Sequence, residues 1–407
     1  MDYIDIFNYL RAIEDYESNA VVIDDKTEIR NFCFESNYRS LLPGGTSNRD
    51  DDYEYISIDA IHEYEPDIIR EMLNKTDSEI VENIKFRYHI LTSRTIQKAQ
   101  GVIFMFHGFN EKHWTKYLPW AHYIVNKTGK AVILFPIAFH MNRAPAAWSD
   151  VREMYAVSQQ RKQRHPDVLH SSLSNVAIST RLHNKPQRFI WSGLQSYYDI
   201  IDLIACIKAD LHPAIRPNAG IDIISYSIGS FLAEILMMTN QNNYFSNSKF
   251  VSLCGGAVFN RLSPVSKFIL DSEANVSLYS YVVEHLESHM KRDKMLQHYL
   301  SDSHPEGVNF RSMLNYKTLT MYRENKFREM SDRIYAIGLK NDMVVPPYEI
   351  INTLKGMNRD IPVRVDVLDF PYKYKHEDPF PAVENIKDRV TEQFHLTFDL
   401  ICDFLNN

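Results

Sequence analysis

Short apolar runs alternate with amphipathic stretches along most of the chain from about residue 84 onwards. Each apolar run has the length of a buried strand, and the stretches between the runs repeat apolar residues at the spacing of a helix. Strands separated by helices are typical of a parallel sheet with helices on both faces. We therefore predict a doubly wound, mostly parallel α/β sheet. Its predicted strands are residues 84–91, 101–106, 131–135, 221–224, 250–254, 333–338 and 363–368.

Helical patterns lie between these strands and after the last one. They cover residues 112–127, 197–207, 228–238 and 390–405. Two long stretches, residues 139–193 and about 256–330, interrupt the alternation. Loops of that length without structure of their own are uncommon in compact domains, and such insertions often form lids over a site. We expect the two insertions to govern substrate choice.

The first 80 residues form a Tyr-rich and acidic leader before the main domain at residues 81–407. Apolar residues recur in the leader near helical spacing from Tyr3 to Ile13, which predicts a helix that docks on the main domain. The run Asp50-Asp51-Asp52 has the composition of a solvated loop, so we assign it no chemistry. We predict an N-terminal extension packed against an α/β domain.

The composition excludes several classes of protein. Hydrophobic residues make up 44% of the chain and charged residues 24%, with a formal net charge of −7, so neither disorder nor a basic surface for nucleic acid is expected. Asp2 and Asp5 interrupt the first residues, which lack the pattern of a signal peptide, and no apolar run is long enough to span a membrane. The four cysteines are scattered among apolar neighbours, which predicts buried thiols in the cytoplasm.

The strongest chemical signal is the segment Ser225-Tyr226-Ser227-Ile228-Gly229, which joins a predicted strand to a predicted helix. A nucleophile elbow needs this order, because its serine stands on a sharp turn where small residues two places before and after let the backbone pass closely. Ser225 and Gly229 supply those small residues. The turn also places Ser227 at a helix N-terminus, which favours developing negative charge.

These residues resemble the α/β-hydrolase superfamily, and within it an uncharacterised bacterial branch. In that family a His-Gly turn after an earlier strand helps to bind the oxyanion, and His107-Gly108-Phe109 matches it. The resemblance implies that the backbone N–H groups of Phe109 and Ile228 form the oxyanion hole. His107 itself is expected to bond the turn and not to act as a base.

The resemblance also implies an acid and a base after later strands. Asp342 follows the strand at 333–338 and matches the acid, and His376 follows the last strand and matches the base. With Ser227 they fall in the family's chain order of Ser, Asp and His. The alternatives are an Asp342 that caps a turn or helix and a His376 on a polar surface loop.

The chain departs from the family pattern at Ser225, where glycine is usual, at Asn110-Glu111 after the His-Gly turn, and at Lys375 before the histidine. These departures argue against the Gly-rich lipase and esterase group. The expected activity is carboxylesterase-like hydrolysis of a small-molecule acyl substrate, with no metal or cofactor. The alternatives are an acyltransferase or small-peptide hydrolase with the same triad, and a non-catalytic binding protein on this fold.

The first insertion is rich in aromatic and basic residues. They offer contacts to an aromatic or anionic acyl group, or they pack as an ordinary lid. The abundant Tyr and Phe residues of the chain serve cores and partner surfaces alike, so they predict no oligomeric state. The insertion residues in question are Phe139, His140, Arg143, Trp148, Arg152, Tyr155, Arg161 and Arg164.

Overall fold

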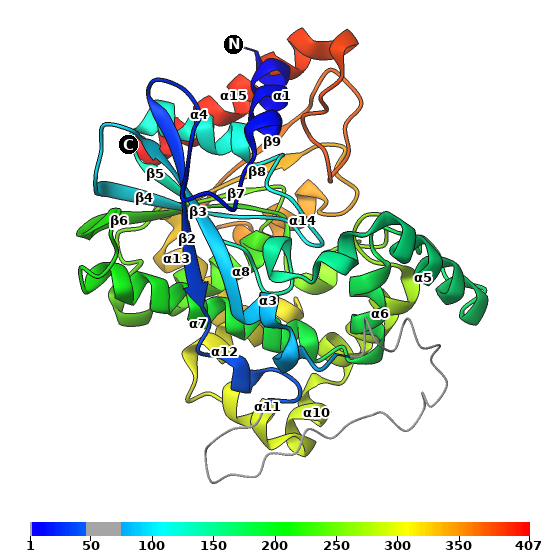
Figure 1. The fold of residues 1–407 in the computed structure, drawn as a ribbon. Coiled ribbons are helices and arrows are strands. Elements are labelled where there is room, and N and C mark those ends of the chain that lie inside the picture. The colour runs from blue at the N-terminus through cyan, green and yellow to red at the C-terminus, as the bar shows by residue number, and fades with distance from the viewer. Residues whose placement is uncertain (1, 46–74) are drawn as a thin grey trace.

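The predicted strands all lie in one mixed sheet, which runs through the centre of the molecule (Figure 1). The computed structural model describes residues 2–45 and 75–407, so the Asp50-Asp51-Asp52 run lies outside the described residues. Within the described part, nine strands pair in the order β1-β2-β3-β5-β4-β6-β7-β8-β9. The strands are β1 Ala20–Val22, β2 Thr27–Glu35, β3 Lys85–Ser93, β4 Ala99–Phe106, β5 Ala131–Leu134, β6 Ile215–Tyr226, β7 Phe250–Leu253, β8 Ile334–Leu339 and β9 Arg364–Leu368.

The six strands β5, β4, β6, β7, β8 and β9 are parallel to one another. At one edge, β3 runs antiparallel to β5, and β2 and β1 continue as antiparallel neighbours. This strand order, with its single antiparallel strand β3 next to the parallel set and helices on both faces, is the α/β-hydrolase fold. The predicted fold class is confirmed.

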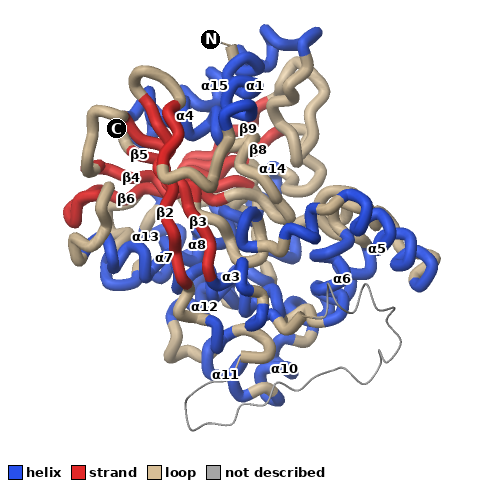
Figure 2. The backbone as a smooth tube through the Cα atoms, in the orientation of Figure 1, coloured by secondary structure: helices blue, strands red, loops and turns tan. Residues whose placement is uncertain are grey.

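Both faces of the sheet are buried, because alternate side chains of each central strand point in opposite directions. In β4, Phe104 and Phe106 belong to one hydrophobic core and Ile103 and Met105 to another. Figure 2 shows the strands between two sets of helices. One set comprises α1 Tyr3–Ile13, α4 Leu118–Thr128 and α15 Lys387–Asn406, and the other α7 Arg188–Lys208, α8 Ile228–Thr239 and α14 Pro347–Leu354.

The two insertions are helical and pack against each other. Arg161 of the first insertion forms a two-pronged ion pair with Asp271 of the second, with N–O distances of 2.5 and 2.8 Å, and both side chains are buried. The helices α6 and α9 also lie in contact. The insertion helices are α5 Val151–Arg164, α6 Val176–Asn184, α9 Ser272–Tyr279, α10 Leu286–Arg292, α11 Lys294–Tyr299, α12 Pro305–Leu314 and α13 Thr320–Glu329.

The leader contributes more than a docking helix. Its strands β1 and β2 extend the sheet, and β2 pairs with β3 along its whole length, whereas the sequence prediction assigned no strand there. Residues of β2 do alternate, with Thr27, Ile29 and Asn31 buried between partly exposed neighbours. The short helix α3, Val81–Ile84, leads from the leader into β3.

Two further predictions were wrong in detail. The helix predicted at 112–127 begins only at Leu118, because Pro119 lacks an N–H group and fits the first turn of a helix, not its interior. Of the four cysteines that were predicted to be buried, Cys254 and Cys402 are buried, Cys206 is partly exposed and Cys33 is exposed. The apolar neighbours of Cys33 point to the other face of β2. Among the described helices, none combines the length and apolar character needed to cross a bilayer.

Candidate active site

Ser227 stands alone between the end of β6 at Tyr226 and the start of α8 at Ile228. Its backbone has φ 55° and ψ −123°, a conformation that L-residues rarely adopt. Such strain persists only where the surroundings enforce it, and it is the geometry of a nucleophile elbow. The turn lifts Ser227 out of the sheet and leaves its side chain partly exposed while its neighbours in β6 are buried.

The two small residues around Ser227, Gly229 and Ser225, are required or tolerated for different structural reasons. A Cβ atom added to Gly229 would lie 2.8 Å from the carbonyl oxygens of both His107 and Phe106, so only glycine fits there. Ser225 occupies the position where the family usually has glycine, and it is accommodated because its hydroxyl bonds Ser230 Oγ at 2.8 Å. Ser252 of β7 donates to the same Ser230 oxygen at 2.8 Å, so the serine at 225 is part of a buried hydroxyl cluster.

The structure brings Ser227, His376 and Asp342 together from three separate loops. His376 Nε2 lies 2.7 Å from Ser227 Oγ, and His376 Nδ1 lies 2.7 Å from Asp342 Oδ2. The ring of His376 and the carboxylate of Asp342 are both buried. A hydrogen-bonded path therefore runs from a buried carboxylate through an imidazole to a partly exposed hydroxyl.

The backbone of the loop after β8 holds Asp342 in place. Its Oδ1 accepts hydrogen bonds from the N–H groups of Val344 and Val345, both at 2.9 Å, which leaves Oδ2 free to accept from His376. Cys254, at the end of β7, lies beside this carboxylate; burial and the charge of Asp342 raise the pKa of its thiol well above the usual value. The carboxylate of Asp342 thus has a fixed orientation and a neutral neighbour.

Tyr226 fixes the position of His376, a role that the sequence did not suggest. Its hydroxyl donates to the backbone carbonyl of His376, and the two rings stack with their centroids 5.5 Å apart and their planes 24° apart. Lys116 Nζ lies 4.6 Å from the centroid of the Tyr226 ring and donates to the carbonyl of Glu377. In the sequence, the only sign of this role of Tyr226 was its position between Ser225 and Ser227.

The His107-Gly108 turn lies next to Ser227, since a Cβ atom added to Gly108 would be 3.5 Å from Ser227 Cβ. His107 Nδ1 bonds the carbonyl of Gly108 at 2.8 Å, and His107 Nε2 accepts from the N–H of Ile137 at 2.9 Å. Burial lowers the pKa of His107 well below its usual value, so the ring is neutral and serves the turn. Tyr117 accepts from the N–H of Gly108 at 2.8 Å.

The two predicted oxyanion donors follow this turn and the elbow. Within the described residues, neither the Phe109 N–H nor the Ile228 N–H has a hydrogen-bond acceptor in the protein. Both residues line a small apolar cavity of about 50 Å³, and Phe109 also lines a larger cleft of about 900 Å³ beside the loop that carries His376. Among the described residues, no group of three or more His, Cys, Asp or Glu side chains is arranged to hold a metal ion.

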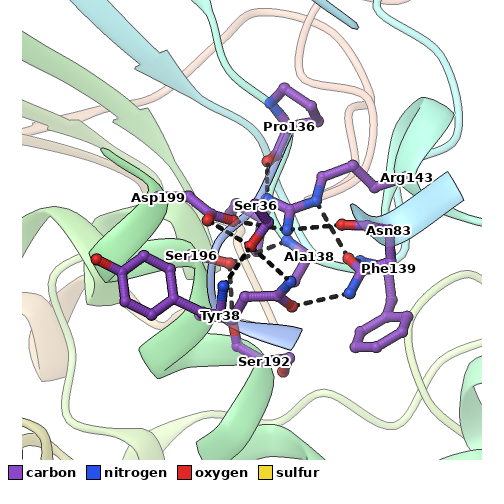
Figure 3. A network of polar contacts seen from close by, with 12 residues as sticks. Ser36, Tyr38, Asn83, Pro136, Ala138, Phe139, Arg143, Ser192, Ser196 and Asp199 are labelled. Carbon is purple, nitrogen blue, oxygen red and sulfur yellow. Dashed lines mark hydrogen bonds and ion pairs between the residues drawn. The ribbon is translucent and has the colours of Figure 1, made fainter. Parts of the chain in front are cut away.

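Two of the basic residues of the first insertion are buried and serve its packing, whereas Arg152, Tyr155 and Arg164 are exposed. Arg143 is fully buried, and Figure 3 shows its guanidinium between Asp199, Asn83 and the carbonyl of Pro136, at 2.8, 3.1 and 3.2 Å. Arg161 is held by Asp271, as described above. These two arginines are therefore not free to bind an anionic acyl group.

Comparisons with known proteins add the following. A family model described as "Family of unknown function (DUF6051)" matches residues 1–406. No curated protein matches the sequence.

Solved structures with a similar fold include esterases of very low identity. A carboxyl esterase from the mycorrhizal fungus Tuber melanosporum has 9% identity and a TM-score of 0.43, with 78% of this chain and 81% of that one covered. An esterase from Pyrobaculum calidifontis has 11% identity and a TM-score of 0.40, with 79% and 81% covered. A carboxylesterase from Lactobacillus plantarum has 10% identity and a TM-score of 0.40, with 78% and 90% covered.

Proposed function

The chain belongs to DUF6051, a family whose description assigns no activity. From the geometry of the site we propose that the protein is a serine hydrolase, which cleaves an acyl bond in a small molecule. The observation that carries the proposal is the path from Asp342 through His376 to Ser227, with both bonds at 2.7 Å. A serine hydroxyl is a weak nucleophile unless an oriented base accepts its proton, and this arrangement supplies one.

In the proposed mechanism, His376 Nε2 takes the proton of Ser227 as the serine oxygen attacks the acyl carbon. Asp342 holds the proton on Nδ1 and stabilises the imidazolium that forms. The N–H groups of Phe109 and Ile228 bind the oxyanion, and loss of one such donor costs about 2.7–4 kcal/mol of barrier in enzymes of this type. The intermediate collapses and His376 returns the proton to the leaving group.

Water then completes the cycle. His376 takes a proton from water, whose oxygen attacks the acyl carbon of the acyl-enzyme, and the second tetrahedral intermediate releases the acid and restores Ser227. Of the possible substrates, a carboxylic ester makes the fewest further demands on the site. We propose that the protein works as a bacterial, cytoplasmic enzyme; the free state of all four cysteines supports a reducing compartment.

A fluorophosphonate probe tests the nucleophile directly. We expect the native protein to gain the mass of one probe less HF on incubation, because the serine oxygen displaces fluoride from phosphorus, and the Ser227→Ala variant to gain none. The Ser252→Ala variant is a matched control, since it removes a buried hydroxyl of the same region without touching the path to His376. Labelling of Ser227→Ala at the native rate would show that another residue reacts.

Two alternatives, an acyltransferase and a non-catalytic binding protein, predict different results with added acyl acceptors. An acyltransferase with the same residues would pass the acyl group to an added alcohol or amine in preference to water, which product analysis by mass spectrometry detects. A non-catalytic binding protein on this fold would show neither labelling nor turnover. The bonded geometry of His376 favours the hydrolase over the binding protein, because binding alone requires no hydroxyl within 2.7 Å of a buried imidazole.

A further inference from the structure

A small, partly enclosed cavity of about 50 Å³ lies directly beside the two proposed oxyanion donors, since Phe109 and Ile228 both form part of its wall. In the proposed mechanism the carbonyl oxygen of the substrate points to the N–H groups of these residues. A substituent of the carbonyl carbon then lies next to this wall, and the narrow apolar cavity suits an alkyl chain. The cavity is therefore placed to receive the acyl chain.

Three phenylalanine rings from three helices form much of the cavity wall. Phe189 comes from α7, Phe231 from α8 and Phe310 from α12 of the second insertion. The ring centroids are 5.9 Å apart for Phe189 and Phe231, 6.0 Å for Phe189 and Phe310, and 5.3 Å for Phe231 and Phe310. Phe310 reaches α7 because residue 193 is glycine: an added Cβ atom would lie 2.7 Å from Phe310 Cε2.

The polar side chains that line the cavity carry no charge near pH 7. The hydroxyls of Ser192 and Ser196 donate to carbonyl groups of their own helix, at 3.2 and 2.7 Å. Burial lowers the pKa of His140 to about 4, so its ring is neutral near pH 7. An ionised acyl group would lose its hydration in this cavity without gaining a partner, which is costly.

We propose that this cavity binds the acyl group of the substrate and limits it to short, uncharged chains, with Phe310 as the residue that sets the length. The proposal rests on the proposed serine hydrolase function. Because a cavity of about 150 Å³ accommodates the six carbon atoms of benzene, a cavity of about 50 Å³ holds roughly two non-hydrogen atoms. The substrate class is thus esters or related acyl compounds of short aliphatic acids.

A series of p-nitrophenyl esters tests the length limit. We expect kcat/KM to fall about tenfold or more between the butanoyl and octanoyl esters, because a hydrophobic pocket discriminates by about tenfold or more for each methylene that does not fit. In Phe310→Ala and the milder Phe310→Leu, the optimum shifts to longer chains. The ratio of the two kcat/KM values within each variant is compared, so a lower yield of folded protein does not affect the result.

Phe259→Ala is the matched control. Phe259 packs on Phe189 with ring centroids 5.1 Å apart and is also buried, but it does not line the cavity. We expect its chain-length profile to equal that of the native protein. The same shift in Phe259→Ala and Phe310→Ala would overturn the role of Phe310, because a general loosening of the core would then explain both.

Alkyl fluorophosphonates distinguish failure of this proposal from failure of the function. The probe's alkyl group on phosphorus takes the place of the acyl chain, and adduct formation needs no turnover. Faster labelling of Ser227 by a methyl or propyl phosphonate than by an octyl phosphonate supports the proposal. Equal rates overturn the length limit and leave the serine hydrolase intact, whereas no labelling by either probe overturns both.

Discussion

Ser227 illustrates what a single residue contributes to the site. Its left-handed backbone costs of the order of 1–3 kcal/mol, and the close packing of Gly229 against the β4 turn supports the strain. The sequence predicted this turn from the order of strand, small residues and helix. It could not predict why Ser225 is tolerated, since the partners of its hydroxyl, Ser230 and Val251, become neighbours only in the folded sheet.

The amide variant of the acid tests the orientation of His376. In Asp342→Asn, Oδ1 can still accept from Val344 and Val345, but an amide NH₂ group then faces Nδ1 and favours the wrong tautomer of the imidazole. We expect kcat to fall roughly 10⁴-fold with little change in thermal stability. Steady-state kinetics and thermal melts check this. Asp369→Asn, at an exposed ion pair with Lys340, should keep native activity; a comparable loss there would contradict the assignment.

Gly229→Ala tests the close approach behind the elbow. The added methyl group would collide with two backbone carbonyls at 2.8 Å, so we expect the free energy of unfolding to fall by about 1–3 kcal/mol or more. Urea denaturation measures the change. Gly220→Ala in β6, the strand before the elbow, is the control, because its added methyl group would meet no atom within 4 Å. Equal losses in the two variants would show that packing at residue 229 is not the cause.

At the level of elements, the loop after β5 is held by a buried polar network. Arg143 bonds Asp199 of α7, and Ser36 at the end of β2 donates to the same carboxylate at 2.6 Å. Asn83 of α3 accepts from the N–H of Phe139 at 3.1 Å (Figure 3). The network joins the leader, the sheet and the first insertion, and its members are too far apart in sequence for spacing to reveal it.

Arg143→Met tests this network. The substitution leaves the Asp199 carboxylate buried without its cation, and we expect a loss of about 3–5 kcal/mol in the free energy of unfolding. The surface variant Arg328→Met breaks an exposed pair with Asp360 and should cost about 0–1 kcal/mol. The double variant Arg143→Met/Asp199→Leu should recover part of the loss, since no unpaired charge is left. No recovery would mean that the ion pair is not the source of the stability.

Helices and strands were predicted best where continuous apolar runs alternated regularly with helical patterns. The central strands and α8 were found because both faces of a parallel sheet need apolar residues, which makes continuous apolar runs. The leader strands β1 and β2 were missed because they are half-exposed and their alternation is weak: in β2 only three of nine residues are buried. The helices of the insertions lie off the sheet, and their lengths follow contacts between the insertions, such as Arg161 with Asp271.

For the whole molecule, buried neutral histidines link stability to pH. Burial lowers the pKa of His89 to about 3 and that of His140 to about 4, and that of His107 well below its usual value. In the unfolded chain these rings take up protons below about pH 6.5. The unfolded state then binds more protons than the folded one, so stability is full above this pH and falls as the pH decreases towards 4.

Chemical denaturation between pH 5 and pH 8 measures this effect. Each such histidine contributes a slope of up to about 1.4 kcal/mol per pH unit below 6.5. His140→Phe should reduce the slope between pH 5 and 6.5, because the phenyl ring takes up no proton. His113→Phe, at an exposed position, is the control and should leave the slope unchanged. An unchanged slope in His140→Phe would contradict the assigned protonation state.

The three residues of the candidate triad were predictable because the order of strands fixes which loops meet at the carboxyl edge of the sheet. The cavity beside them was not, since Phe310 belongs to an insertion whose path no pattern revealed. Nor did the sequence show that the leader completes the sheet. Local periodicity reports the regular core, whereas the insertions and the leader depend on contacts between distant segments.

The contact between α1 and α15 can form only late in synthesis, because the two helices lie far apart in the sequence (Figure 1). Tyr3 N donates to Thr391 Oγ1 across 388 positions of sequence, and Lys387 pairs with both Asp2 and Asp5. At about 5–20 residues per second, a ribosome needs roughly 20–80 s between making the two partners. During synthesis the apolar face of α1 therefore stays uncovered, and accessible to chaperones and proteases, until α15 has been made.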